Sequence, residues 1–186
     1  MSPVNGFDPD GADFIGFSQS TNTVTWYAGT VAEPGKAMAA WQAGSGGLWS
    51  AGNGSTKFWE SIAPGSYSIN LNFPQSNVSW FGELGNNASI PSWGLQFFGE
   101  KVNGWGTWRA RIWEGLGLSG GPSVRNLYLH DLHPALIQEG LLMTHGCIGV
   151  GKQEFSFIEN NPSLYQMMLD YQKNVSNDYI DLQVTE

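Results

Sequence analysis

The sequence predicts a mainly β fold built as one domain. Its 186 residues include 25 Gly, 9 Pro, 9 Trp, 10 Phe and 6 Tyr, whereas charged residues make up only 13%. Aromatic residues favour strands and Gly and Pro favour turns, so this composition indicates short aromatic strands joined by turns. Because no repeat, linker or shift in composition divides the chain, we expect a single domain over residues 1–186.

Most of the expected elements are strands, because β-branched and aromatic residues lie between turn signals. Gly29 ends the first strand, and Pro64-Gly65 makes a turn before another. The periodicity of Lys36–Ala43 fits a helix or a strand, and the glycine-rich run that follows ends it in either case. Apart from this ambiguous segment, the expected strands are Asn22–Ala28, Ser66–Asn72, Gly94–Phe98, Trp108–Trp113, Asn126–His130 and Tyr179–Val184.

One helix is expected after residue 160. Asn161 can cap its start, Pro162 suits its first turn, and apolar residues then recur at helical spacing. These apolar residues are Leu164, Met167, Met168 and Tyr171.

Charge and hydropathy exclude several classes of partner. The formal net charge is −8, which argues against a nucleic-acid-binding surface. No apolar run reaches the roughly 18 residues of a membrane span, so we expect no membrane insertion. The segment from Met1 to Asp10 has neither the basic nor the apolar part of an export signal, and none is expected there.

The single cysteine, Cys147, is the strongest candidate for a reactive group. All three histidines, His130, His133 and His145, fall within the 18 residues that end at it. An imidazole can take the thiol proton, so a Cys and His pair predicts nucleophilic catalysis. No histidine follows Cys147, which excludes a papain-like order, and the caspase signature is absent.

The residues around this thiol resemble the L,D-transpeptidase catalytic domain family. That family has a His at a strand end, then Ser-x-Gly-Cys followed by Ile and usually Arg. This chain has His130, and 17 residues later Cys147 within Thr144-His145-Gly146-Cys147-Ile148. Three further segments are similar to the family, namely Thr23–Gly29, the Pro-Gly-x-Tyr-x-Ile pattern in Ile62–Ile69, and Leu164–Val184.

The resemblance implies a single-domain L,D-transpeptidase-like β-sandwich with one or two helices near the active site. It also implies acyl transfer on peptidoglycan stem peptides, without metal or cofactor. Cys147 would be the nucleophile and His130 the base, and backbone N–H groups around Gly146 would bind the oxyanion. An amine acceptor would give a cross-link or an exchanged D-amino acid, and water would give L,D-carboxypeptidase activity.

Substrate binding is expected to involve residues beside this pair, and three departures from the family pattern bear on it. Thr144 stands in place of Ser, Asp131 in place of Gly or Ser, and Gly149 in place of Arg. Another arginine can bind the substrate carboxylate instead, because guanidinium binds carboxylate in a bidentate way. The candidate substrate-binding residues are His145, Thr144, Tyr128, Asp131, His133, Arg125, Arg109 and Arg111.

Two other functions fit parts of the sequence. His130-x-x-His133 with His145-x-Cys147 offers four zinc-type ligands, although the spacing is loose. The tryptophans suggest a non-catalytic glycan-binding β-module, since aromatic faces stack on sugars, although the aromatic residues of a small β-domain usually fill its core.

The substrate and the absence of an export signal together raise the question of delivery. L,D-transpeptidase-like toxins secreted by the type VI system also lack signal peptides and act in the periplasm of a rival bacterium. By this resemblance we expect an antibacterial effector with a cognate immunity protein.

Overall fold

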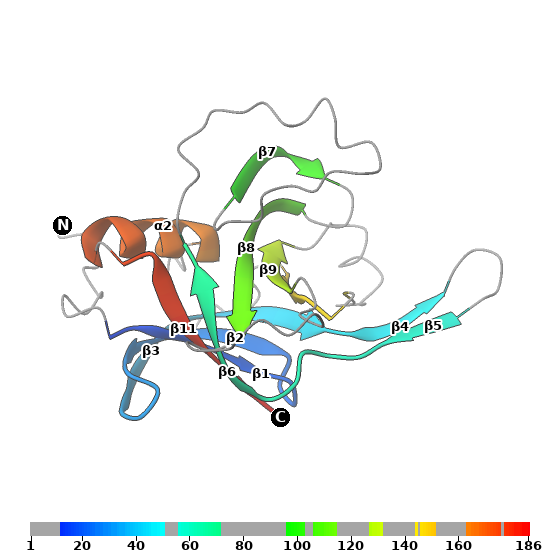
Figure 1. The fold of residues 1–186 in the computed structure, drawn as a ribbon, viewed down its shortest axis with the longest axis horizontal. Helices are drawn as coiled ribbons and strands as arrows, with labels where there is room; N and C mark the ends of the chain where they lie inside the picture. Colours follow the sequence, from blue (N-terminus) through cyan, green and yellow to red (C-terminus); the bar gives the residue numbers. More distant parts are fainter. Residues whose placement is uncertain are drawn as a thin grey trace.

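The computed structural model describes residues 12–50, 56–71, 96–102, 106–114, 127–131, 144, 146–151, 163–175 and 177–186. These residues form a mainly β structure with one helix (Figure 1). The strands are β1 (Phe14–Ser18), β2 (Thr23–Gly29), β3 (Pro34–Ser45), β4 (Gly47–Ser50), β5 (Thr56–Trp59), β6 (Gly65–Asn70), β7 (Gln96–Val102), β8 (Gly106–Glu114), β9 (Tyr128–Asp131), β10 (Ile148–Val150) and β11 (Tyr179–Thr185), and the helix is α2 (Leu164–Val175).

Nine of these strands form one sheet in the order β6-β11-β1-β2-β3-β10-β9-β8-β7. A further pairing between β6 and β8 joins the two sides, so the sheet closes on itself like a barrel. The mainly β prediction is confirmed, and the layers expected of a sandwich are the opposite walls of this closed sheet. Strands β4 and β5 form a separate pair that extends away from the closed sheet (Figure 1).

Two parallel pairings connect distant parts of the chain. β1 pairs with β11, so that Phe14 lies beside Asp181, and β9 pairs with β10, so that His130 lies beside Gly149. All the other pairings in the sheet are antiparallel. The β9–β10 pairing is the one that positions the candidate site.

The core fills the inside of the closed sheet, and α2 packs against it. The apolar face of α2 is buried, and its Tyr171 meets Trp26 of β2 edge-on with ring centroids 5.6 Å apart. The Trp26 indole N–H donates a 2.9 Å hydrogen bond to the Asp13 carboxylate, which satisfies that buried polar group. Helix residues in the core are Leu164, Met167, Met168 and Tyr171, as their spacing predicts.

The cap of α2 differs from the prediction. The Ser163 hydroxyl accepts a 3.1 Å hydrogen bond from the Gln166 backbone N–H, and the helix begins at Leu164. Ser163 is therefore the N-cap, and Asn161 and Pro162 lie outside the described residues.

The strand predictions hold with shifted ends, and four strands had no prediction. The ambiguous segment Lys36–Ala43 belongs to the long strand β3, whose alternating burial is typical of a half-covered sheet. In β11 the burial alternates as predicted, with Ile180, Leu182 and Val184 inside and Tyr179 outside. The strands without a prediction are β1, β4, β5 and β10.

Within the described part of the chain, no helix is long and apolar enough to cross a membrane.

Candidate active site

The candidate site lies on one face of three neighbouring strands, β8, β9 and β10. Arg109 of β8 pairs with His130 of β9, and His130 pairs with Gly149 of β10, so the three residues form a row across the sheet. Cys147 directly precedes β10, and its thiol lies within hydrogen-bonding reach of the Tyr128 backbone in β9. Neighbouring strands lie ~4.8 Å apart, and residues two positions apart on one strand lie ~6.6 Å apart. The sequence motif is therefore brought together in space.

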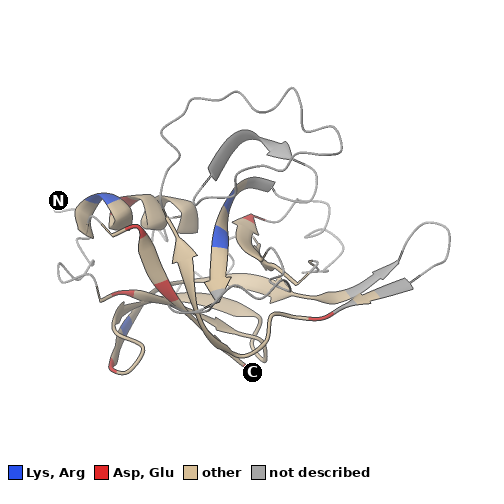
Figure 2. Ribbon diagram, viewed as in Figure 1, with Lys and Arg blue, Asp and Glu red and all other residues tan. Residues whose placement is uncertain are grey.

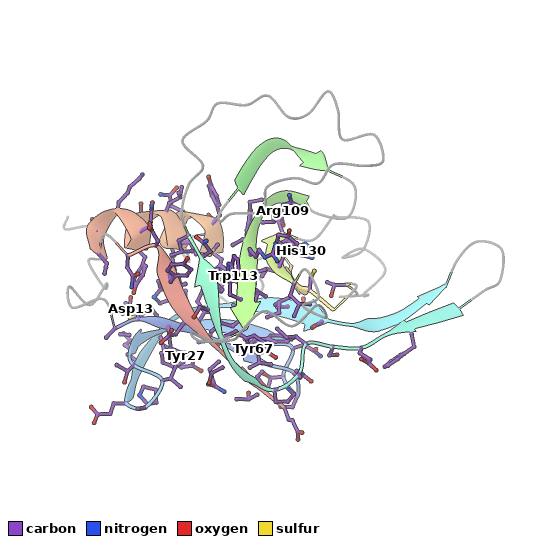
Figure 3. The ribbon with its side chains drawn as sticks, viewed as in Figure 1. Asp13, Tyr27, Tyr67, Arg109, Trp113 and His130 are labelled. Atoms are coloured by element: carbon purple, nitrogen blue, oxygen red, sulfur yellow. The ribbon has the colours of Figure 1, made fainter. Side chains whose placement is uncertain are left out.

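Alternation along these strands separates the site from the core. Leu129 and Ile148 point to the core and are fully buried. Arg109, Tyr128 and His130 alternate with these core residues and point to the other face. Cys147 lies beside them, just before β10. Figure 3 shows the Arg109 and His130 side chains close together at β8 and β9. Each of the four is less than 9% exposed, so this polar face is buried as well.

His130 is held in an orientation that suits a base. Its Nδ1–H donates a 2.8 Å hydrogen bond to the Asp131 backbone carbonyl, because a carbonyl can only accept. This bond fixes the ring and leaves Nε2 as the nitrogen that can take a proton. Burial lowers the pKa of His130 to about 4, against partial compensation from the bond to Asp131. The imidazole is therefore neutral at neutral pH.

Cys147 is buried in polar surroundings. Burial raises the pKa of its thiol, while hydrogen bonding to the Tyr128 backbone and the positive charge of Arg109 lower it. The balance leaves the thiol protonated at neutral pH, so nucleophilic attack requires removal of the proton by a base. A neutral thiol beside a neutral imidazole is an arrangement for general-base catalysis.

The peptide groups on both sides of the Cys147 Cα are fixed by hydroxyl groups. The Ser45 hydroxyl donates a 3.1 Å hydrogen bond to the Gly146 carbonyl, and the Thr144 hydroxyl donates one to the Cys147 carbonyl. In a trans peptide the N–H points opposite to the carbonyl, and no described peptide is cis. The N–H groups of Cys147 and Ile148 are thereby aimed away from these hydroxyls.

Thr144 and Ser45 are themselves tied to neighbouring strands. Thr144 exchanges two hydrogen bonds with Gly46, one of 3.1 Å from its N–H to the Gly46 carbonyl and one of 3.2 Å to its hydroxyl from the Gly46 N–H. The Ser45 hydroxyl also accepts a 2.9 Å bond from the Ile62 N–H. The structure thus gives Thr144 a positioning role, and its predicted contact with substrate stays a prediction.

Gly146 has a conformation that requires glycine. Its φ of 95° lies in the left-handed region, and a Cβ there would lie 3.2 Å from the Glu60 carbonyl oxygen. Both facts disfavour any side chain. Because residue 146 is glycine, the chain just before β10 can lie close to the Glu60 backbone. Cys147 follows, directly before the start of β10.

Two arginines extend the site along β8. The Arg109 guanidinium lies 4.8 Å from the centroid of the Tyr128 ring, and that of Arg111 lies 4.8 Å from the centroid of the Trp113 ring. Such cation–π contacts hold each guanidinium in place. Figure 2 shows this basic strand beside β9, which ends in the acidic residue Asp131.

Several predicted site residues lie outside the described part of the chain. They are His133, His145 and Arg125, and the zinc hypothesis depends on two of them. Among the described residues, no three His, Cys, Asp or Glu side chains form a group that could hold a metal. Sequence reasoning missed Ser45 and Gly46 altogether. Their only sequence signal was the glycine-rich run 44–47, which we interpreted as the end of a helix or a strand.

Comparisons with known proteins give structural likeness at low identity. No family model matches the sequence, and no curated protein gives a sequence match. Bd1075 of Bdellovibrio bacteriovorus is similar over 100% of this chain and 50% of its own, with a TM-score of 0.47 and 7% identity. An L,D-transpeptidase of Mycobacterium tuberculosis H37Rv covers 94% of this chain and 58% of its own, with a TM-score of 0.38 and 15% identity. L,D-transpeptidase 3 of Mycobacterium tuberculosis covers 94% and 61%, with a TM-score of 0.39 and 13% identity. The chain thus spans 50–61% of the length of these proteins.

Proposed function

We propose that this protein is a cysteine-dependent acyltransferase that acts on peptidoglycan stem peptides. The observation that carries the proposal is the placement of Cys147, directly before β10, beside the face of β9 that carries His130. The proposal also rests on the resemblance of the residues around Cys147 to the L,D-transpeptidase motif.

The first chemical step is attack by sulfur on a carbonyl carbon. His130 Nε2 takes the thiol proton as the S–C bond forms, which converts the carbonyl to a tetrahedral oxyanion. The Ser45 hydroxyl fixes the peptide group between Gly146 and Cys147, and the Cys147 N–H of that peptide is the candidate oxyanion donor. In enzymes where one such donor was removed, the loss was about 3 kcal/mol.

The second step expels the terminal D-residue. The C–N bond breaks as protonated His130 returns its proton to the leaving amine, which gives a thioester on Cys147. An amine acceptor then loses its proton to His130 and forms a new amide, or water forms a free acid. Transpeptidation, D-amino-acid exchange and L,D-carboxypeptidase activity differ only in this acceptor.

Arg109 and Arg111 are the described candidates for binding a substrate carboxylate. They are two residues apart on β8 and therefore on the same face, with Arg109 beside His130. An anionic stem peptide lying along β8 would place its carboxylates against this strand.

The reaction is tested with purified tetrapeptide and pentapeptide muropeptides, with and without a free D-amino acid, and mass spectrometry of the products. Loss of a terminal D-Ala indicates a carboxypeptidase, and its replacement indicates exchange. Turnover by the unmodified protein that disappears in Cys147→Ala is expected. Unchanged muropeptides under all conditions, or equal turnover by Cys147→Ala, would refute the proposal.

We further propose that the protein is an antibacterial toxin that acts in the periplasm of a target cell. This proposal rests on the substrate class, because peptidoglycan lies outside the cytoplasm. Expression directed to the periplasm should arrest growth, whereas cytoplasmic expression and periplasmic Cys147→Ala should not. A co-expressed immunity protein should relieve the arrest. Equal harm from both compartments would contradict this assignment.

A further inference from the structure

Arg109 is a buried cation on the reactive face, although it has no role in the proton transfer described above. Its side chain is only 4% exposed, and its guanidinium lies over the Tyr128 ring. Burying a guanidinium costs several kcal/mol unless nearby groups compensate. A charge kept at this position despite that cost is expected to act on its neighbours.

Arg109 lies next to both reactive groups on this face. Arg109 pairs directly with His130, and Tyr128, on which the guanidinium rests, lies beside Cys147. The positive charge acts on both, because it favours the thiolate form of Cys147 and disfavours protonation of His130. The two effects come from one fixed position above the Tyr128 ring.

Other charged and titratable groups around this face do not have this double effect. Arg111 acts on Arg109 by repulsion, and the charge of Asp131 favours protonation of His130. Tyr128 attracts Arg109 and lies between it and Cys147. Among the described residues, Arg109 is thus the cation whose charge acts on both Cys147 and His130.

We propose that Arg109 is a positioning residue of this site, whose fixed positive charge stabilises the anion that forms on Cys147 and keeps His130 free to accept the proton. The S–H bond breaks and an N–H bond forms at His130, and Arg109 itself neither gains nor loses a proton. The catalytic meaning of this role rests on the proposed acyl transfer. The electrostatic relation is a property of the resting protein and can be measured without substrate.

Loss of the charge can be distinguished from loss of the packing by the direction of two titrations. Removing a positive charge raises the pKa of both Cys147 and His130. Letting water into the site instead lowers the pKa of Cys147 and raises that of His130, because hydration favours both charged forms. A merely structural role therefore moves the two groups in opposite directions.

The experiment is an NMR titration of protein labelled with [13Cβ]cysteine and ring-13C histidine. The chain has one cysteine, so the cysteine signal reports Cys147 alone, and the His130 signal is assigned by its absence in His130→Gln. The variants are Arg109→Gln, Arg109→Met and Arg109→Lys. Arg111→Gln, two residues along the same strand face, is the matched control, and thermal melts verify that each variant folds.

The expected result is a rise of about one pH unit or more in the Cys147 titration midpoint of Arg109→Gln or Arg109→Met, with His130 also moving upward. Arg109→Lys should keep most of the unmodified behaviour, since it retains the charge. Arg111→Gln should leave Cys147 unmoved. An unchanged or lowered Cys147 midpoint in the variants without charge, or an equal rise in Arg111→Gln, would overturn the proposal.

If neither neutral variant folds, Arg109→Lys provides the test. A Cys147 titration midpoint within about half a pH unit of that of the unmodified protein supports the charge role, and a larger fall of this midpoint overturns it. Failure of muropeptide turnover with these shifts present would refute the acyl transfer but leave this electrostatic role standing.

Discussion

The two faces of β8, β9 and β10 are both buried around His130 and Cys147 but are built from opposite kinds of side chain. On the inner face, Ala110, Leu129 and Ile148 are fully buried in the core. On the other face, His130 is 3% exposed and Cys147 is 6% exposed, and both are polar or reactive. Burying polar groups costs free energy, whereas burying apolar groups stabilises the fold. Stability explains why apolar side chains are buried on the inner face. The burial of polar and reactive side chains on the other face requires another explanation.

The comparison shows that neighbouring residues on one strand can serve separate purposes. Leu129 and His130 are adjacent in sequence, and strand alternation sends them to opposite faces. Changes on the inner face should therefore affect mainly stability, and changes on the reactive face mainly chemistry. The predictions below test that separation.

Cys147→Ala is expected to have the largest effect. Muropeptide turnover should fall to background, by about 10⁴-fold or more, because the nucleophile is lost and only binding remains. The fold should persist, since alanine replaces a small buried side chain. Mass spectrometry measures turnover and circular dichroism measures the fold. Turnover above a tenth of the unmodified rate would mean that Cys147 is not the nucleophile.

Leu129→Ala tests the inner face of the same strand. Removing this fully buried side chain should lower the free energy of unfolding by about 2–5 kcal/mol. Turnover per folded molecule should fall much less than in His130→Gln, since His130 points to the other face. Urea denaturation gives the stability of each variant. A larger loss of turnover in Leu129→Ala than in His130→Gln would show that the two faces are not separable.

His130 predicts an unusual pH dependence of both activity and stability. With a pKa of about 4, about 90% of the imidazole is unprotonated at pH 5, against about 3% for an ordinary histidine with a pKa near 6.5. Activity should therefore persist at pH 5 and fall only near pH 4. An acid limb near pH 6.5 in kcat/KM would contradict the burial of His130.

The same group links protonation to folding. The unfolded chain binds the proton near pH 6.5 and the folded protein only near pH 4, so stability falls as the pH drops through this window and then levels off. The loss attributable to His130 is about 3 kcal/mol by pH 4. In His130→Gln this part of the pH dependence should disappear from urea denaturation curves measured between pH 7 and 4. Identical curves for the two proteins would refute the assignment.

Much of the fold and the two central site residues could be predicted from local sequence pattern. β2, β6, β8, β9, β11 and α2 carry clear alternation or helical spacing, and His130 and Cys147 stand out by residue type. β10 has only three residues, and Gly16 interrupts the apolar pattern of β1, so neither could be found from the sequence. The closure of the sheet depends on pairings between residues far apart in the chain, which no local pattern encodes. The positioning roles of Ser45 and Gly46 have the same cause, because they arise only when β3 lies beside the loop before β10.

Thr144 provides the finest test, since it supports the reactive face without belonging to the proton transfer. Its hydroxyl donates to the Cys147 carbonyl and accepts from the Gly46 N–H. Thr144→Val has nearly the same shape but leaves both of these buried groups without that partner, which should cost about 1–3 kcal/mol of stability. Because the same bond holds the backbone of Cys147 in place, kcat should fall more than KM rises. Thr144→Ser, which keeps the hydroxyl, should restore most of both properties. Equal losses in Thr144→Ser and Thr144→Val would mean that the methyl group, and not the hydroxyl, positions the loop.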